Sequence, residues 1–353
     1  MNAPAPCDVL VVGAGPAGSS AARAAADEGA RVVLVDRRQA IGVPVQCAEY
    51  IPAMLRVDEA SACAEACVQE IRGLRTFVRG EPAGGLNSPG YTIDRDRFDQ
   101  LLAAAAERAG AQLLTATEAL PCERRTVVLR RKGLNTLTLR PRVVVGADGP
   151  LSTVARWVGI IAPSVVAGVQ ARVRLARPMD MAEVYLHPDF RGGYAWLFPK
   201  GEHANAGVAF VSAKGRHSVS SALARFVHEL TSQGKITGSV LARTAGWIPI
   251  SSPSATLRRH VVLAGDAAGQ THPITGAGVY NAIVGGRIAG TWAARAALAD
   301  DTRLLEHSQE EWQDVLGETM ARAKEKRLFM EANWERFDDT IRSCWITFRE
   351  YYV

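Results

Sequence analysis

The stretch Asp8-Val-Leu-Val-Val-Gly13-Ala-Gly15-Pro-Ala-Gly18 decides the fold of this chain. Residues 8–12 form a short apolar run, which is typical of a buried parallel strand, and the alanine-rich residues 16–28 predict a helix. Residues 31–36 form a second apolar strand, which ends at Asp36 and completes a βαβ unit. A GxGxxG sequence that follows a strand and opens a helix predicts a site for a dinucleotide.

Each glycine of this turn has its own physical reason. Gly13 permits the tight turn, Gly15 lets the backbone approach a pyrophosphate, and Gly18 lets the helix pack closely on the strand. The amides at the helix N-terminus, near Ala17, then meet the negative phosphates. Asp36 is expected to accept a hydrogen bond from an adenosine ribose hydroxyl.

Composition and charge indicate a globular protein and exclude several classes. The chain has 353 residues, of which 48% are hydrophobic, and this length allows two or three domains. The net charge of +5 is not gathered into a basic stripe, so no nucleic-acid partner is expected. The basic runs Arg124-Arg125 and Arg130-Arg131-Lys132 are interpreted as the solvated face of a hairpin with its turn at Gly133-Leu-Asn.

Targeting signals and cysteine spacing point to a reducing compartment. The N-terminus shows no signal peptide, and no apolar run is long enough for a membrane-spanning helix. The six cysteines form no CxxC, and no histidine cluster has metal-ligand spacing, so neither a metal nor a disulfide framework is predicted. We therefore expect a cytoplasmic protein, with a peripheral position at a membrane as the alternative.

The rest of the chain divides into regions of different character. Further elements are expected as a helix at 96–109, strands at 112–117, 126–131, 136–145 and 260–264, and a helix at 276–298. Residues 165–250 alternate apolar and polar side chains between glycines and prolines, which indicates antiparallel sheet. The last fifty residues are helical in pattern. Their apolar side chains are interpreted as core packing, with a partner interface or membrane contact as alternatives.

Two more turns carry chemistry. Val143-Val-Val-Gly-Ala-Asp148-Gly149 is a strand that ends in an Ala-Asp-Gly turn, and Val261-Val-Leu-Ala-Gly265-Asp266 is a strand that ends in Gly-Asp. The latter continues into Pro273-Ile-Thr-Gly276-Ala-Gly278. With the GxGxxG turn, these motifs resemble the large flavoprotein family that includes aromatic hydroxylases and geranylgeranyl reductases. The resemblance implies FAD as the cofactor.

The resemblance also implies roles for these residues. Asp266 would bind ribityl or ribose hydroxyls, and the turn at Gly276 and Gly278 would offer amides and a helix N-terminus to the pyrimidine end of the isoalloxazine. A helix N-terminus stabilises the negative charge that reduced flavin gathers there. Arg95 matches a family arginine near the cofactor phosphates, with a salt bridge at a helix start as the alternative. The predicted cofactor-binding residues are Gly13, Gly15, Ala17, Gly18, Asp36, Arg37, Arg95, Asp148, Gly265, Asp266, Gly276 and Gly278.

Gly193-Tyr194-Ala-Trp196-Leu-Phe198-Pro-Lys-Gly201 resembles the YxWxFPKG signature of geranylgeranyl reductases. Because a strand places alternate side chains on one face, the three aromatic residues would form an apolar wall suited to an isoprenoid chain. Core packing is the alternative. Pro273, in the glycine-rich turn, completes the predicted substrate residues.

The loop Gly42-Val-Pro-Val-Gln-Cys47-Ala48-Glu49-Tyr50 matches a family loop near the flavin and substrate, although Ala48 replaces the commoner glycine. An isolated alkene has no carbonyl to take up charge, so a proton must reach one carbon as a hydride reaches the other. Cys47, Glu49 and Tyr50 are the candidate catalytic residues, with Cys47 first. A buried structural role for Cys47 is the alternative.

The resulting function is an FAD-dependent oxidoreductase that reduces C=C bonds of a prenyl, geranylgeranyl-type chain. NAD(P)H or a ferredoxin would supply electrons by transient docking, because a second dinucleotide fingerprint is absent. The partner would be an apolar small molecule or lipid. The main alternative is a monooxygenase acting on an aromatic substrate or on a side chain of a partner protein, and a third is a non-catalytic electron carrier.

The predicted fold class is α/β. A Rossmann-like FAD-binding domain would comprise 1–160 and 255–300, with 42–90 contributing to the flavin and substrate pocket. Residues 161–254 would form an antiparallel β-sheet substrate domain, and 301–353 a helical C-terminal segment.

Overall fold

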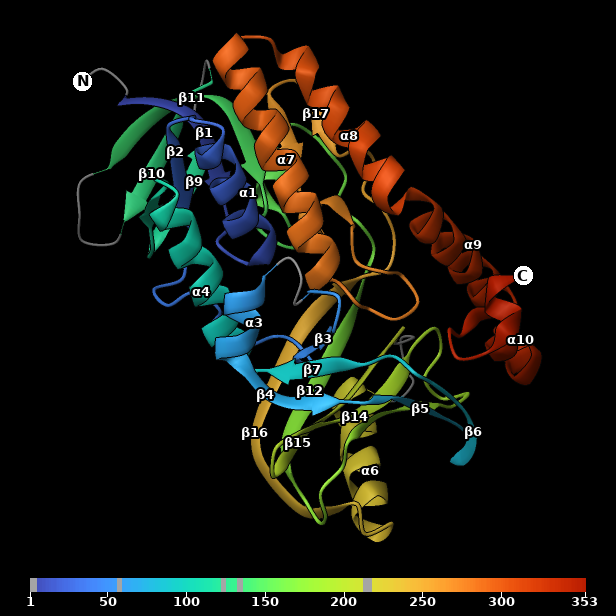
Figure 1. The fold of residues 1–353 in the computed structure, drawn as a ribbon. Coiled ribbons are helices and arrows are strands. Elements are labelled where there is room, and N and C mark those ends of the chain that lie inside the picture. The colour runs from blue at the N-terminus through green and yellow to red at the C-terminus, as the bar shows by residue number, and fades with distance from the viewer. Residues whose placement is uncertain (1–4, 56–58, 122–124, 132–135, 212–217) are drawn as a thin grey trace.

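The computed structural model describes residues 5–55, 59–121, 125–131, 136–211 and 218–353. Two large sheets lie at opposite ends of the molecule, and a helical arm runs along one side of it (Figure 1). The predicted α/β class, with a Rossmann-like sheet, an antiparallel sheet and a helical C-terminus, is therefore confirmed. The predicted turn at 133–135 lies outside the described residues, as do Arg124 and Lys132.

The first sheet is built around the strand that precedes the GxGxxG turn. β1 (Ala5–Val12) pairs in parallel with β2 (Val32–Val35) on one side and with β11 (Leu137–Gly146) on the other, and β11 pairs in parallel with β18 (Val261–Leu263). Val9, Leu10 and Val11 of β1 are fully buried, as expected for a strand covered on both faces. The remaining strands of this sheet are β8 (Gln112–Leu114), β9 (Thr117–Pro121), β10 (Val127–Arg131) and β17 (Leu257–Arg258).

The single strand predicted at 112–117 is two strands, β8 and β9. The chain turns between them at Ala116, whose φ of 51° lies in the left-handed region and interrupts extended backbone. Because β8 pairs with β2 whereas β9 pairs with β10, the turn sends the chain from one part of the sheet to another.

Two helices cross at close range against this sheet. α1 (Pro16–Asp27) packs on α7 (Val279–Ala299), where a Cβ at Gly286 or Gly290 would lie 2.1 Å from a backbone oxygen of α1. α7 begins at Val279 rather than at residue 276, because the preceding residues form the glycine-rich turn. α4 (Arg95–Arg108) and the short α5 (Thr153–Trp157) complete the helices around the first sheet.

The second sheet has the order β16-β12-β15-β14-β13-β5-β6 and is antiparallel except where β13 pairs with β5. It extends beyond the predicted range 161–254, because two of its strands come from the N-terminal part of the chain. Its strands are β5 (Gly73–Val78), β6 (Glu81–Leu86), β12 (Val165–Leu175), β13 (Met181–Leu186), β14 (Tyr194–Lys200), β15 (His203–Phe210) and β16 (Ile236–Pro249), and α6 (Val219–Ser232) packs on it.

A small third sheet joins the two large ones. It consists of β3 (Tyr50–Pro52), β7 (Gly90–Ile93) and β4 (Cys67–Ile71), and β7 leads directly to α4. The short helix α3 (Ala60–Ala66) precedes β4 and packs near α4. This arrangement carries the loop before β3 to the space between the two large sheets (Figure 1).

The C-terminal arm, residues 307–353, consists of α8 (His307–Trp312), a π-helical turn (Gln313–Gly317), α9 (Glu318–Ala332), α10 (Phe337–Cys344) and the last residues of the chain, which include a short 3₁₀ helix (Arg349–Tyr352). Met330, Trp334 and Phe337 are buried in one cluster with side chains of β13 and β14, whereas Val315 and Phe329 are exposed. Core packing therefore accounts for part of the apolar pattern. Among the described residues, no helix is both long enough and apolar enough to cross a membrane.

Candidate functional site

The three glycines of the first turn differ in what surrounds them. A Cβ at Gly13 would lie 2.3 Å from the Ala147 oxygen, and one at Gly18 would lie 1.7 Å from the Gly13 oxygen. A Cβ at Gly15 would have no heavy atom within 4 Å. Gly13 and Gly18 are thus required by backbone packing. Gly15 faces open space at the N-terminus of α1, which suits the pyrophosphate of a dinucleotide.

The Asp36 carboxylate lies at the edge of this turn. Its Oδ2 accepts a hydrogen bond of 2.8 Å from the Ala14 amide, and its Oδ1 accepts one of 2.8 Å from the Arg38 amide. Each oxygen retains a lone pair for a ribose hydroxyl. Arg37, the next residue, is exposed.

The Asp148 carboxylate points to its own helix. It accepts hydrogen bonds from the Ser152 hydroxyl and from the Thr153 and Val154 amides, at 2.5, 2.6 and 3.2 Å. These contacts cap α5 and fix the Asp-Gly turn behind Gly13. The geometry gives Asp148 a role in shaping the turn, and its direct contact with cofactor stays a prediction.

The Gly-Asp turn lies close to the start of α7. The Thr271 hydroxyl donates a hydrogen bond of 2.5 Å to Asp266 Oδ1, and a Cβ at Gly278 would lie 2.9 Å from that hydroxyl. Burial raises the pKa of Asp266, although Thr271 and the positive charge of Arg95 oppose the rise. Gly278 is the N-cap of α7, whose first amides lack partners within the helix. The arrangement brings together a carboxylate and helix amides, which are the groups predicted for the flavin.

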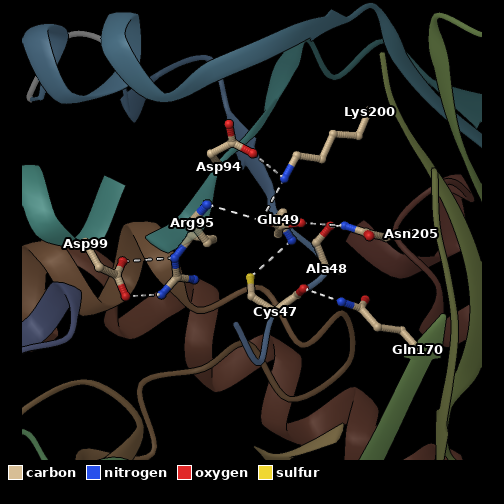
Figure 2. A network of polar contacts seen from close by, with 9 residues as sticks. All are labelled: Cys47, Ala48, Glu49, Asp94, Arg95, Asp99, Gln170, Lys200 and Asn205. Carbon is tan, nitrogen blue, oxygen red and sulfur yellow. Dashed lines mark hydrogen bonds and ion pairs between the residues drawn. The ribbon is translucent and has the colours of Figure 1, made fainter. Parts of the chain in front are cut away.

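Side chains of the second sheet hold the loop around Cys47 by hydrogen bonds (Figure 2). Gln170 Nε2 on β12 donates to the Cys47 oxygen at 2.7 Å, and Asn205 Nδ2 on β15 donates to the Ala48 oxygen at 3.1 Å. Within the loop, the Glu49 amide donates to Cys47 Sγ at 3.2 Å. We call residues 46–50 the Cys47 loop. Its backbone position is therefore set by side chains of the sheet.

Glu49 lies at the centre of a buried polar network (Figure 2). Its Oε1 accepts from Lys200 Nζ at 2.9 Å and from the Arg95 amide at 3.1 Å, and its Oε2 accepts from Asn205 at 2.9 Å. Lys200 also reaches Asp94, at 2.8 Å. Donors from three other segments of the chain thus occupy both oxygens of Glu49. These bonds give Glu49 a structural role in holding the loop, and its role as a proton donor stays a prediction.

Arg95 joins the Cys47 loop to α4. Its Nε and Nη2 form a bidentate ion pair with Asp99, at 3.0 Å for each bond, and the guanidinium also lies beside the Cys47 thiol. Burial lowers the pKa of Arg95, but Asp99 and Cys47 outweigh it, so the pKa is raised. The alternative reading of Arg95, a salt bridge at a helix start, is thus observed.

The Tyr50 hydroxyl is bonded to a backbone oxygen outside the Cys47 loop. It donates to the Ser88 oxygen at 2.8 Å, and its ring lies 5.8 Å from that of Phe198. Burial raises the pKa of Tyr50. Of the three predicted catalytic residues, Cys47 is the one whose reactive atom is half-buried and not taken up by a strong acceptor.

The three aromatic residues of β14 form one row, as alternation predicts. Ring centroids are 5.9 Å apart for Tyr194 and Trp196, and 6.4 Å apart for Trp196 and Phe198. The row packs against the Cys47 loop through Tyr50, and against the C-terminal arm through Trp345, whose ring lies 5.1 Å from Tyr194. Among the described residues, Trp196 Nε1 is buried without a hydrogen-bond partner.

A separate cavity of about 520 Å³ lies between α7, α8 and α9 and the loops at 250–256 and 268–273. Pro273 lines it, but Tyr194, Trp196 and Phe198 do not. Pro273 and the aromatic row therefore do not line this cavity together.

Several residues of the site carried no motif of their own. Gln170, Asn205 and Asp94 were not predicted, and neither was the bond from Lys200 to Glu49. Lys200 belongs to the YxWxFPKG signature, so the signature contained a signal. Its partner, however, lies 151 residues away in the chain.

Comparison with known proteins agrees with this geometry. Residues 6–315 match the FAD binding domain family. The chain is 35% identical over 340 residues to a digeranylgeranylglycerophospholipid reductase of Methanothrix thermoacetophila, covering 90% of this chain and 85% of that protein. It is 34% identical over 359 residues to digeranylgeranylglycerophospholipid reductase 2 of Methanopyrus kandleri, covering 94% and 88%.

Solved structures show the same architecture. A geranylgeranyl bacteriochlorophyll reductase-like protein from Thermoplasma acidophilum superimposes with a TM-score of 0.84 at 28% identity, covering 96% of this chain and 91% of that chain. The flavin-dependent brominase Bmp2 gives a TM-score of 0.76 at 14% identity, covering 95% and 90%. At that identity the brominase shows only that the fold is shared.

Proposed function

The chain belongs to the FAD-binding domain family and, within it, to the digeranylgeranylglycerophospholipid reductases, and from this premise we propose that it saturates C=C bonds in the prenyl chains of a glycerolipid. It is an FAD-dependent oxidoreductase of the geranylgeranyl reductase type. One observation carries the proposal: Lys200, in the signature strand, bonds Glu49 of the Cys47 loop at 2.9 Å. A thiol and an aromatic row are thereby held next to each other.

The residues present fit FAD. Gly15 and the start of α1 would hold the pyrophosphate, Asp36 the adenosine ribose, and Asp266 and the α7 N-terminus the ribityl chain and flavin ring. When bound, FAD supplies the hydride that one alkene carbon receives.

The chain itself must supply the proton for the other carbon. We assign this role to the Cys47 thiol, because both oxygens of Glu49 already accept hydrogen bonds within the protein and the Tyr50 hydroxyl donates to the Ser88 oxygen. Arg95 lies beside Cys47, where its positive charge would pair with the sulfur after transfer. General acid catalysis of this kind is worth about 10²–10⁴-fold in rate.

The aromatic row is assigned to the prenyl chain. Tyr194 is half-buried beside the Cys47 loop, whereas Trp196 and Phe198 are buried in one cluster with side chains of the C-terminal arm, so Tyr194 would contact the prenyl chain and the other two would support it from behind. Holding a flexible chain in one orientation is itself a large part of catalysis. The lipid would be taken up by peripheral contact with a membrane, and the exposed Leu328 and Phe329 on α9 offer apolar surface for that contact.

The electron donor is proposed to be NAD(P)H or a ferredoxin that docks transiently. The GxGxxG sequence occurs once with strand and helix on either side of it, and we assign that turn to FAD. A donor therefore has no dinucleotide domain of its own.

The test uses holoenzyme reduced with dithionite in the absence of oxygen and incubated with a geranylgeranyl glycerophospholipid. Mass spectrometry is expected to show the gain of two hydrogen atoms per saturated bond. Cys47→Ser should lower product formation about 100-fold while FAD stays bound, and Cys67→Ser, at another half-buried cysteine, serves as the control. Turnover that requires oxygen, or no mass gain with any prenyl lipid, would overturn the proposal in favour of a monooxygenase.

A further inference from the structure

The turn between Asp266 and α7 has few hydrogen bonds between its own backbone groups. We call residues 272–278 the flavin turn. Within it, the His272 amide donates to the Ala277 oxygen and the Gly276 amide donates to the His272 oxygen, each at 2.9 Å. Gly276 has a φ of 68°. These bonds join residues of the turn only to one another. Contacts with other segments must therefore fix the orientation of the turn in the protein.

One such contact comes from the last residues of the chain. Tyr351 Oη lies 3.2 Å from His272 Nε2, and the Thr275 amide donates to His272 Nδ1 at 3.3 Å. Because Nδ1 accepts, the ring hydrogen is on Nε2 and is donated to Tyr351. Burial lowers the pKa of His272 to about 4, so the ring is neutral near pH 7. This bond links the C-terminal residues to the first residue of the flavin turn.

A second contact comes from α9. Arg327 Nη1 donates to the Gly192 oxygen at 2.6 Å and, at 3.4 Å, to the Pro273 oxygen. Its Nε pairs with Glu331 at 2.6 Å, and only 4% of the Arg327 side chain is exposed. Burying a guanidinium is costly unless its bonds are made. Arg327 makes bonds through Nη1 to two backbone segments that are far apart in the chain and through Nε to Glu331, whereas Nη2 is buried without a hydrogen-bond partner among the described residues.

The third contact closes a ring of interactions. The Tyr194 hydroxyl donates to the Thr275 oxygen, and Tyr194 follows Gly192 by two residues at the start of β14. The flavin turn is thus bonded to the aromatic strand by Tyr194, and both are bonded to α9 by Arg327. A displacement of the C-terminal arm would move the turn and the strand together.

We propose that Tyr351 and Arg327 are positioning residues that hold the flavin turn in the conformation that binds FAD. The proposal rests on the assignment, made under the proposed function, of this turn to the flavin ring. It assigns a role to the C-terminal arm, whose Arg327 and Tyr351 bond the flavin turn. Neither residue needs to touch FAD or substrate.

The first test compares Tyr351→Phe with Tyr352→Phe. Tyr351 is buried, whereas Tyr352 is 54% exposed and donates its hydroxyl to Ile346 at the surface. Full-length apoprotein is titrated with FAD, and the flavin absorbance bands of each complex are recorded. Loss of the Tyr351 hydroxyl leaves the buried His272 Nε2 hydrogen without an acceptor, so FAD should bind about tenfold more weakly, with shifted bands. Tyr352→Phe should match the wild type.

The second test compares Arg327→Lys with Arg322→Lys, since Arg322 is in an exposed pair with Glu318 on the same helix. Lysine keeps the charge of Arg327 but cannot bond Gly192, Pro273 and Glu331 together, so weaker FAD binding is expected again. Wild-type affinity and absorbance bands in both Tyr351→Phe and Arg327→Lys would overturn the proposal.

A variant of the flavin turn separates the two possible failures. Gly276→Ala strains a backbone at positive φ inside the turn, and it should weaken FAD binding. If it does while Tyr351→Phe and Arg327→Lys do not, the turn binds FAD but the C-terminal arm does not position it. If Gly276→Ala also binds FAD like the wild type, the assignment of the turn to the flavin fails. Prenyl reduction is not measured in any arm.

Discussion

Gln170 on β12 donates a hydrogen bond of 2.7 Å from Nε2 to the backbone oxygen of Cys47, which precedes it by 123 residues. The bond runs from the second sheet to a loop that leads out of the first. Asn205 makes the equivalent bond to the Ala48 oxygen. The thiol proposed to donate a proton is therefore aligned by the sheet that carries the aromatic row.

Gln170→Leu removes this donor while keeping the size and shape of the side chain. The Cys47 oxygen then loses its partner and the thiol loses its alignment, so turnover of a prenyl lipid should fall about tenfold. The ratio of flavin to protein absorbance should stay at the wild-type value. Gln100→Leu is the control, since Gln100 also donates to a backbone oxygen, that of Ile41. Equal turnover in the two variants would contradict the role of Gln170.

Lys200→Met leaves Glu49 buried without its cation. The side chains of Lys200 and Glu49 are only 6% and 9% exposed, so the free energy of unfolding should fall by about 3 kcal/mol. Urea denaturation of the apoprotein measures this change. The control is Arg130→Met, because Arg130 and Glu118 are 60% and 50% exposed and should contribute less than about 0.5 kcal/mol. A double variant, Lys200→Met with Glu49→Leu, should recover part of the loss.

Local rules predicted the parts of the site that local geometry controls. The order strand, GxGxxG, helix requires a turn with Gly15 at its mouth, and strand alternation places Tyr194, Trp196 and Phe198 in one row. The motif did not indicate that Ser152 and Thr153, only four and five residues after Asp148, would bond its carboxylate, although both lie close to it in the chain.

These local rules could not predict contacts between segments that are distant in the chain. The bond from Lys200 to Glu49 depends on how the small third sheet meets β14, and no periodicity in the sequence encodes that meeting. The same holds for Tyr351 and His272. A helical pattern in the last fifty residues indicates that helices form, but not which backbone turn their ends will reach.

His272 predicts a dependence of stability on pH. Burial lowers its pKa from 6.5 to about 4. Between pH 4 and pH 6.5 the unfolded chain binds a proton at His272 that the folded chain does not. The contribution of neutral His272 to the free energy of unfolding is therefore complete above pH 6.5 and decreases as the pH falls toward 4. The slope approaches 1.36 kcal/mol per pH unit. Urea denaturation at a series of pH values should show the wild type losing about 3 kcal/mol relative to His272→Gln, which does not titrate. Parallel curves would show that folding does not lower the pKa of His272.

The glycine-rich turn gives the most direct test of cofactor placement. Gly15 has a φ of −76°, which alanine adopts readily, and an added Cβ would meet no atom of the protein within 4 Å. Gly15→Ala should therefore leave the thermal stability of the apoprotein unchanged, while the methyl group enters the space assigned to the pyrophosphate. Affinity for FAD, measured by titration, should fall at least about tenfold.

Gly18→Ala is the matched contrast in the same helix turn. Its Cβ would lie 1.7 Å from the Gly13 oxygen, so α1 must move away from the turn and the apoprotein should lose stability by more than about 2 kcal/mol. The two variants thus distinguish the open space beside Gly15, which we assign to a ligand, from the space beside Gly18, which backbone atoms fill. If Gly15→Ala bound FAD as tightly as the wild type, the pyrophosphate would have to lie elsewhere, and the assignment of α1 to the cofactor would be wrong.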